Sequence, residues 1–76
     1  MAIERKYQKK DNAWWQDREV KTLKDNMFFD VLIPAGTVGT VDERSANPSE
    51  GVWVLFLPSE VIVLYAWRDL DLVDRG

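Results

Sequence analysis

Short apolar runs separated by turn residues dominate the chain from residue 18 onward. β-Branched and aromatic residues fill these runs, and no long stretch repeats its apolar positions at helical spacing. The pattern predicts an all-β domain of five short strands, over residues 18–24, 37–42, 52–57, 61–65 and 70–73. Residues 27–33 form another apolar stretch, which the sequence leaves as either a long extended loop or a short irregular strand before Pro34. Residues 66–69 predict a single helical turn.

Two glycines carry structural predictions. Gly36 follows Pro34 and Ala35, and this order predicts a β-turn that needs a positive φ. Gly39 falls inside a predicted strand and indicates either a β-bulge or a close backbone approach. A phosphate-binding loop is not predicted, because the Gly-Lys-Ser/Thr ending of such loops is missing here.

The strands predicted over 52–57 and 61–65 lack a polar face. If Val52, Val54 and Phe56 point inward, the residues between them point outward, and both sets are apolar. A hairpin of these strands would therefore expose a contiguous apolar patch, which on a soluble chain marks a contact site. The predicted interface residues are Trp53, Leu55, Leu57, Ile62, Leu64 and, at the rim of the patch, Trp67.

Three occupants could cover this patch: a second copy of the chain, the chain's own N-terminal segment with Trp14 and Trp15, or a different protein. Four or five large side chains contribute several kcal/mol at ~25 cal/mol per Å² of buried apolar area. A single core below about 80 residues supplies only ~3–5 kcal/mol by itself. The free energy gained by covering the patch is therefore similar to the free energy that the core supplies. For this reason we expect a homo-oligomer or a protein partner.

The amino-acid composition limits which catalytic and metal-binding sites the chain can form. The 76 residues suffice for one small domain, and they include neither cysteine nor histidine. Disulfides, cysteine or histidine zinc sites and a Ser-His-Asp triad are thereby excluded within one chain. The cluster of Asp69, Asp71 and Asp74 lacks the glycine-turn loop of a calcium site. We therefore predict no catalytic residue, no metal site and no cofactor, and we expect a non-catalytic protein.

The apolar runs are far below the roughly 18 residues that span a membrane. The N-terminus also lacks the apolar stretch of a signal peptide. These two observations predict a cytoplasmic protein without a membrane partner.

Charge is unevenly distributed along the chain. The net charge is −3, but residues 1–10 hold four basic residues against Glu4, for a local charge of +3. Residues 11–76 hold six basic and twelve acidic residues, for a charge of −6. We interpret 1–16 as a basic, aromatic and poorly ordered segment and 17–76 as the folded domain. The residues available for nucleic-acid contact are Arg5, Lys6, Lys9, Lys10 and Trp14, although the acidic body disfavours that partner.

Three strings, Ile33–Val41, Val54–Phe56 and Asp69–Val73, resemble the small SH3-like β-barrels, and the resemblance extends over about residues 18–74. That group includes KOW-type modules and the small ferredoxin-docking subunit of photosystem I. The resemblance implies a five-stranded SH3-like barrel. As a fold-level pattern, it predicts the shape better than the activity. Three functions stay open: an assembly module that uses the apolar hairpin face, a nucleic-acid-binding KOW-like regulatory module that uses the basic N-terminal residues, and an accessory subunit that docks on a larger enzyme, as some members of the group do.

One further resemblance implies an enzyme. Ile62-Val63-Leu64-Tyr65 is similar to the Val-Gln-Ile-Tyr active-site strand of type II dihydrofolate reductase, an SH3-like barrel that forms a tetramer around a central pore. Val63 stands where that family has the glutamine that contacts both ligands. Only Tyr65 and Lys21 then match, so the resemblance carries over the shape of the strand without its central ligand contact.

Overall fold

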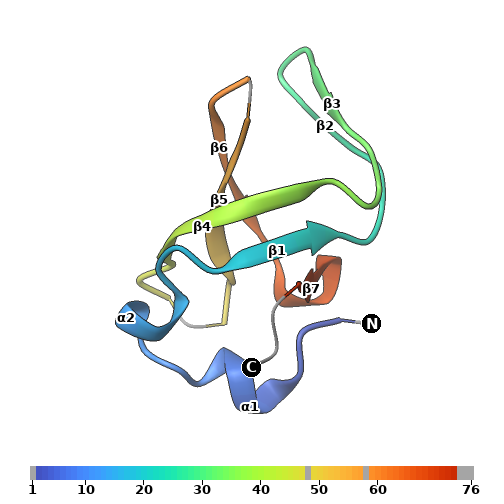
Figure 1. The fold of residues 1–76 in the computed structure, drawn as a ribbon. Coiled ribbons are helices and arrows are strands. Elements are labelled where there is room, and N and C mark those ends of the chain that lie inside the picture. The colour runs from blue at the N-terminus through green and yellow to red at the C-terminus, as the bar shows by residue number, and fades with distance from the viewer. Residues whose placement is uncertain (1, 48, 58, 74–76) are drawn as a thin grey trace.

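The computed structural model is mostly β, and it describes residues 2–47, 49–57 and 59–73. Seven strands in two sheets and three short helical segments occur within these residues (Figure 1). In chain order they are α1 (Arg5–Gln8), α2 (Asn12–Trp15), β1 (Glu19–Thr22), β2 (Asn26–Phe28), β3 (Val31–Ile33), β4 (Val38–Arg44), β5 (Val52–Phe56), β6 (Val61–Tyr65), the 3₁₀ turn η1 (Trp67–Asp69) and β7 (Leu70–Leu72). All five predicted strands and the predicted helical turn are present, with small shifts at their ends.

The larger sheet is antiparallel, with strand order β6-β5-β4-β1-β7. The predicted closed barrel is wrong, because β6 and β7 remain separate edges of this sheet in the described part of the chain. Only three residues form β7, and they pair with β1 alone. The core is completed by side chains from the N-terminal segment, from η1 and from the second sheet, rather than by strand pairing.

The second sheet is the β2–β3 hairpin, formed by the stretch that the sequence left undecided. Phe28 pairs with Val31, so the connection is a two-residue turn of Phe29 and Asp30. The irregular-strand alternative is thus the closer one, but the stretch makes two strands instead of one. Both the β2–β3 and the β5–β6 hairpins project to the same side of β1 and β4 (Figure 1).

The two predicted glycine positions have different outcomes. Gly36 has a φ of 85°, as its turn requires, and its N–H donates to the Thr22 carbonyl at 2.7 Å. At Gly39 the close-approach alternative is correct. A Cβ on Gly39 would lie 2.5 Å from Val54 Cγ1 and 2.8 Å from Phe56 Cε1. The β-bulge lies further along β4, between Val41 and Glu43.

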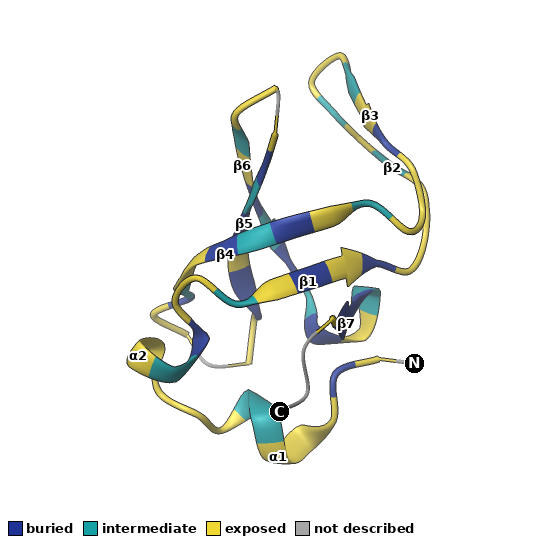
Figure 2. Ribbon diagram, viewed as in Figure 1, coloured by how far each residue is buried: buried dark blue, intermediate teal, exposed yellow. Residues whose placement is uncertain are grey.

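The core lies on the inner face of the larger sheet, where alternate strand residues are buried (Figure 2). Val20, Val41 and Val54 are fully buried there, because successive strand side chains point to opposite faces. Ile3 and Trp15 join the same cluster from the N-terminal segment. The expectation that this segment is poorly ordered is therefore not confirmed.

Candidate functional site

The outward residues of the β5–β6 hairpin form an apolar face, defined here as Trp53, Leu55, Leu57, Ile62 and Leu64. Burial alternates along β5, with Val52, Val54 and Phe56 inside. Trp53 pairs with Leu64 and Leu55 pairs with Ile62 across the two strands. Directly opposed side chains lie about 5 Å apart at Cβ, so the face is continuous. Of the two registers that the sequence left open, the structure adopts the one with Val52, Val54 and Phe56 inside.

The apolar face is accessible in the single chain. Leu57 is 68% exposed, Ile62 is 49% exposed and Trp53 is 37% exposed, while Leu55 and Leu64 are half-buried. Across the sheet, β4 places Thr40 opposite Leu55 and Glu43 opposite Trp53, so polar side chains border the face on that side. An apolar centre with a polar border is the arrangement of protein–protein interfaces.

Trp67 lies elsewhere, and its predicted place at the rim of the patch is wrong. It is buried in the core, with its ring centroid 5.1 Å from that of Trp15. The helical turn η1 places this ring on the core side, so alternation along a strand could not locate it. Trp67 therefore adds no surface to the apolar face.

The N-terminal segment does not cover the apolar face. Its fully buried residue, Trp15, packs on Trp67, and the Ile3 N–H donates to the Trp67 carbonyl at 3.4 Å. The segment is fixed along β4 as well, where the Arg44 N–H donates to Asn12 Oδ1 at 2.7 Å. Of the three possible occupants of the patch, the chain's own N-terminal segment is therefore excluded.

The residues available for nucleic-acid contact differ in their accessibility. Arg5, Lys6, Lys9 and Lys10 are exposed in and after α1. The Trp14 ring is instead engaged: it stacks on Tyr7 at 5.5 Å, contacts the Trp15 ring, and has the Arg18 guanidinium 3.6 Å from its centroid. A nucleobase could stack on Trp14 only by displacing one of these groups.

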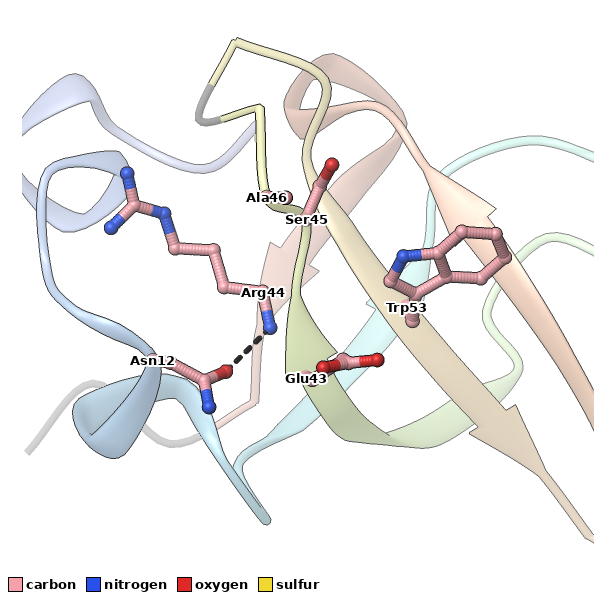
Figure 3. A pocket seen from close by; sticks show the side chains of 6 residues that line it. All are labelled: Asn12, Glu43, Arg44, Ser45, Ala46 and Trp53. Carbon is pink, nitrogen blue, oxygen red and sulfur yellow. Dashed lines mark hydrogen bonds between the residues drawn. The ribbon is translucent and has the colours of Figure 1, made fainter.

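A hollow of about 470 Å³ lies at the Trp53 end of the apolar face (Figure 3). It is lined by Asn12, Glu43, Arg44, Ser45, Ala46 and Trp53. Arg44 extends away from Trp53, and its Nη1 donates to the Lys10 carbonyl at 2.7 Å. Ser45 Oγ donates to Glu50 Oε1 at 3.1 Å and so closes the β4–β5 loop. The polar groups here hold the loop and the N-terminal segment, and Trp53 is shared with the apolar face.

The residues that resemble type II dihydrofolate reductase do not share a surface. Val63 and Tyr65 point into the core, and the Tyr65 ring lies 5.7 Å from both Phe28 and Phe56. Burial raises the pKa of the Tyr65 hydroxyl, and the nearby Asn26 side chain partly opposes that shift. Lys21 is exposed on β1, two strands away from β5. Tyr65 is therefore buried in the core, and Lys21 lies on a different strand from the one that carries the resemblance.

A metal site would need grouped acidic side chains, and a membrane span would need a long apolar helix. Within residues 2–47, 49–57 and 59–73, acidic side chains form no group of three that could hold a metal ion. Asp69 pairs with Lys24 at 3.4 Å, and Asp74, the last residue of the predicted acidic cluster, lies outside the described residues. None of the helices in the described part has the length and apolar character needed to cross a membrane.

A second exposed apolar set was missed by sequence reasoning. This hairpin surface, defined as Met27, Phe29 and Leu32, lies on β2–β3, with Met27 65% exposed, Phe29 96% exposed and Leu32 56% exposed. The signal was present in the sequence, because residues 27–33 hold six apolar residues and one polar residue. Without the hairpin register, however, nothing showed which of them face the solvent.

Comparison with protein-family models, with curated proteins and with solved structures finds no match for this chain. The function is therefore inferred from the structure of the chain alone.

Proposed function

We propose that this protein is a small non-catalytic assembly module that self-associates through the apolar face. The single observation that supports this most is the exposure of Trp53 and Ile62 on one side of β5–β6, with Leu57 exposed directly after β5. Large apolar patches on soluble chains mark interaction sites. Trp53 supplies the aromatic anchor that such interfaces favour.

The size of the chain supports self-association as the means of covering the face. A core of this size supplies only ~3–5 kcal/mol, and small domains gain stability from disulfides, metals or oligomerisation. This chain has no cysteine, and its described residues hold no metal-binding group. Association remains as the source of additional stability, and the apolar face is the surface that would provide it.

We also propose that the fold is SH3-like, as the sequence resemblance implies. The strand order β6-β5-β4-β1-β7, with a hairpin between β1 and β4 and a 3₁₀ turn before β7, is compatible with that fold. One fold hosts many unrelated functions, so this assignment is compatible with an assembly module but identifies neither its function nor its partner.

Analytical ultracentrifugation of the wild type and of two face variants, Leu55→Asp and Leu64→Asp, tests the proposal. We expect the wild type to associate with increasing concentration and both variants to shift the association constant by at least tenfold toward monomer. Val73→Asp is the control, because Val73 is also apolar, is 46% exposed, and directly follows β7, the other edge strand of the sheet. A wild type that stays monomeric, or a control that dissociates as strongly as the face variants, contradicts the proposal.

A further inference from the structure

One edge of the larger sheet, β6, has an open side. β5 is the only strand that pairs with β6 in the described part of the chain, and it does so over Val61–Tyr65. Among the described residues, no backbone hydrogen bond from a loop or from another strand reaches β6. An edge strand presents a row of N–H and C=O groups on its free side, and an extended strand is the structure that pairs with such a row. The chemistry of this edge therefore matches a further β-strand.

β6 lacks the features that keep edge strands from pairing. Its residues, 61–65, include no charged residue, proline or glycine, and its register with β5 contains no bulge. Natural sheets protect their edges with short strands, charged side chains, proline or bulges. The other edge, β7, has two of these features, because it is three residues long and carries Asp71. Of the two edges, β6 is thus the one that can accept a strand.

We infer that β6 of one copy pairs antiparallel with β6 of a second copy, across a twofold axis at Val63. This inference rests on the proposed self-association and specifies its geometry. A twofold contact uses the same patch on both copies, and an antiparallel pair of identical edges meets that condition. Main-chain hydrogen bonds supply the affinity when a strand is added to a sheet in this way.

The side chains of β6 suit this pairing on both faces of the sheet. With the axis at Val63, Ile62 opposes Leu64 of the second copy, and Val61 opposes its Tyr65. Directly opposed residues lie on the same face, so each of these pairs joins two apolar side chains. Ile62 and Leu64 belong to the apolar face, and Ile62 is 49% exposed in the single chain. The apolar faces of the two copies would therefore form one continuous surface.

Other registers fit less well. A shift of two residues in one direction places Glu60 opposite Leu64 of the second copy, which sets a carboxylate against an apolar side chain. The same shift in the other direction requires Trp67 as a strand residue, but Trp67 lies in η1. A shift of one residue joins the outer face of one copy to the inner face of the other. The axis at Val63 is the position that uses all five residues of β6.

Charge at the two ends of β6 favours the antiparallel direction. Glu60 is exposed immediately before the strand, and Arg68 is exposed after it, in η1. Asp69, next to Arg68, already pairs with Lys24 at 3.4 Å. An antiparallel pair brings the Glu60 end of each copy toward the Arg68 end of the other, whereas a parallel pair would set two Glu60 carboxylates side by side. Complementary charges fix the orientation of an interface, and like charges oppose it.

Disulfide cross-linking tests the register, because the chain contains no cysteine of its own. Ile62→Cys and Leu64→Cys place the two sulfur atoms on directly opposed residues of different copies, close enough for a disulfide. In either variant alone, the two cysteines are offset by two residues along the paired strands. We expect an equimolar mixture to form disulfide dimers at least tenfold faster than either variant alone, as measured by non-reducing gel electrophoresis under mild oxidation.

A mixture of Leu57→Cys and Leu64→Cys is the matched control. Leu57 is also apolar and is 68% exposed, but it follows β5 instead of lying on the edge strand. This mixture should cross-link at least tenfold more slowly than the mixture of Ile62→Cys and Leu64→Cys. Circular dichroism of the three variants establishes that the fold is retained.

Sedimentation of the wild type separates the inference from the proposed function. If the wild type associates but the Ile62→Cys and Leu64→Cys mixture cross-links no faster than the control, edge pairing is overturned and self-association stands. If Ile62→Cys alone cross-links faster than the mixture, the axis at Val63 is overturned as well. A monomeric wild type overturns both proposals, because only a strand of a different protein could then occupy the edge.

Discussion

Trp15 and Trp67 come from opposite ends of the chain, and their rings lie 5.1 Å apart with an interplanar angle of 43°. Both are buried, and Trp15 Nε1 donates to the Tyr7 carbonyl at 2.9 Å. This contact joins the N-terminal segment to the turn before β7. It makes the segment part of the core instead of an appendage.

Trp15→Ala should therefore unfold most of the protein. Replacing a buried tryptophan by alanine costs about 3–5 kcal/mol, which equals the ~3–5 kcal/mol that a core of this size supplies. Trp53→Ala is the control, because Trp53 is partly exposed and should have a much smaller effect on the monomer. Urea denaturation followed by circular dichroism measures both variants. An unchanged midpoint for Trp15→Ala would show that the N-terminal segment is dispensable.

Three glycine-to-alanine variants should differ in severity according to what surrounds each glycine. Gly51→Ala should be the most destabilising, because its Cβ would collide with the Tyr65 carbonyl and its φ is 127°. Gly39→Ala should cost about 1–3 kcal/mol through crowding against Val54 and Phe56. Gly36→Ala has open space and suffers only from its positive φ, so its cost should be about 1 kcal/mol. Denaturation midpoints give the ranking, and Gly36→Ala as the most severe variant would contradict it.

Stability should fall as the pH rises above 10 because of Tyr65. The ordinary tyrosine pKa of 10.0 applies to the unfolded chain, whereas burial raises the pKa of the folded Tyr65 hydroxyl. The unfolded chain therefore loses this proton first. The stabilising contribution is complete below pH 10 and is lost as the pH passes through the folded value. Urea midpoints measured across this range for wild type and Tyr65→Phe isolate the effect, and equal slopes would contradict it.

Phe29→Gly should leave the fold intact or stabilise it slightly. Glycine relieves the positive φ at this turn, so the free energy of unfolding should stay constant or rise by up to about 1 kcal/mol. Thermal unfolding of the variant and of the wild type measures the difference. A variant that loses stability would show that the ring packs within its own chain.

Single-stranded oligonucleotides should not bind detectably at low salt. The body of the chain is acidic, and Trp14 is engaged by Tyr7 and Arg18. Fluorescence anisotropy with a labelled oligonucleotide measures this. Salt-dependent binding that disappears when Lys6 and Lys9 are changed to Glu would instead support the nucleic-acid alternative. These substitutions are preferable to removing residues 1–10, because Ile3 is part of the core.

The sequence predicted most strands and the apolar character of both faces of β5–β6, since alternation of period two depends only on local geometry. It left open which of the two faces points inward. It predicted the position of Gly36 for the same reason, because a turn is set by a few adjacent residues. Predictions that depended on distant partners were less accurate. Three predictions depended on which segments meet in space, and the sequence does not show this. They were the closed barrel, the position of Trp67 at the rim of the patch and the poor order of the N-terminal segment.

The amino-acid sequence by itself determined that this protein is mostly β and that it carries more apolar side chains than one inner face can bury, because strand period and side-chain polarity are properties of neighbouring residues. Only the tertiary structure decided which apolar residues stay exposed. Trp15 and Trp67 are buried against each other, while Phe29 and Leu57 are left in solvent at the ends of two hairpins. The physical reason is that burial depends on packing between segments far apart in the chain, and pattern along the sequence does not contain that information.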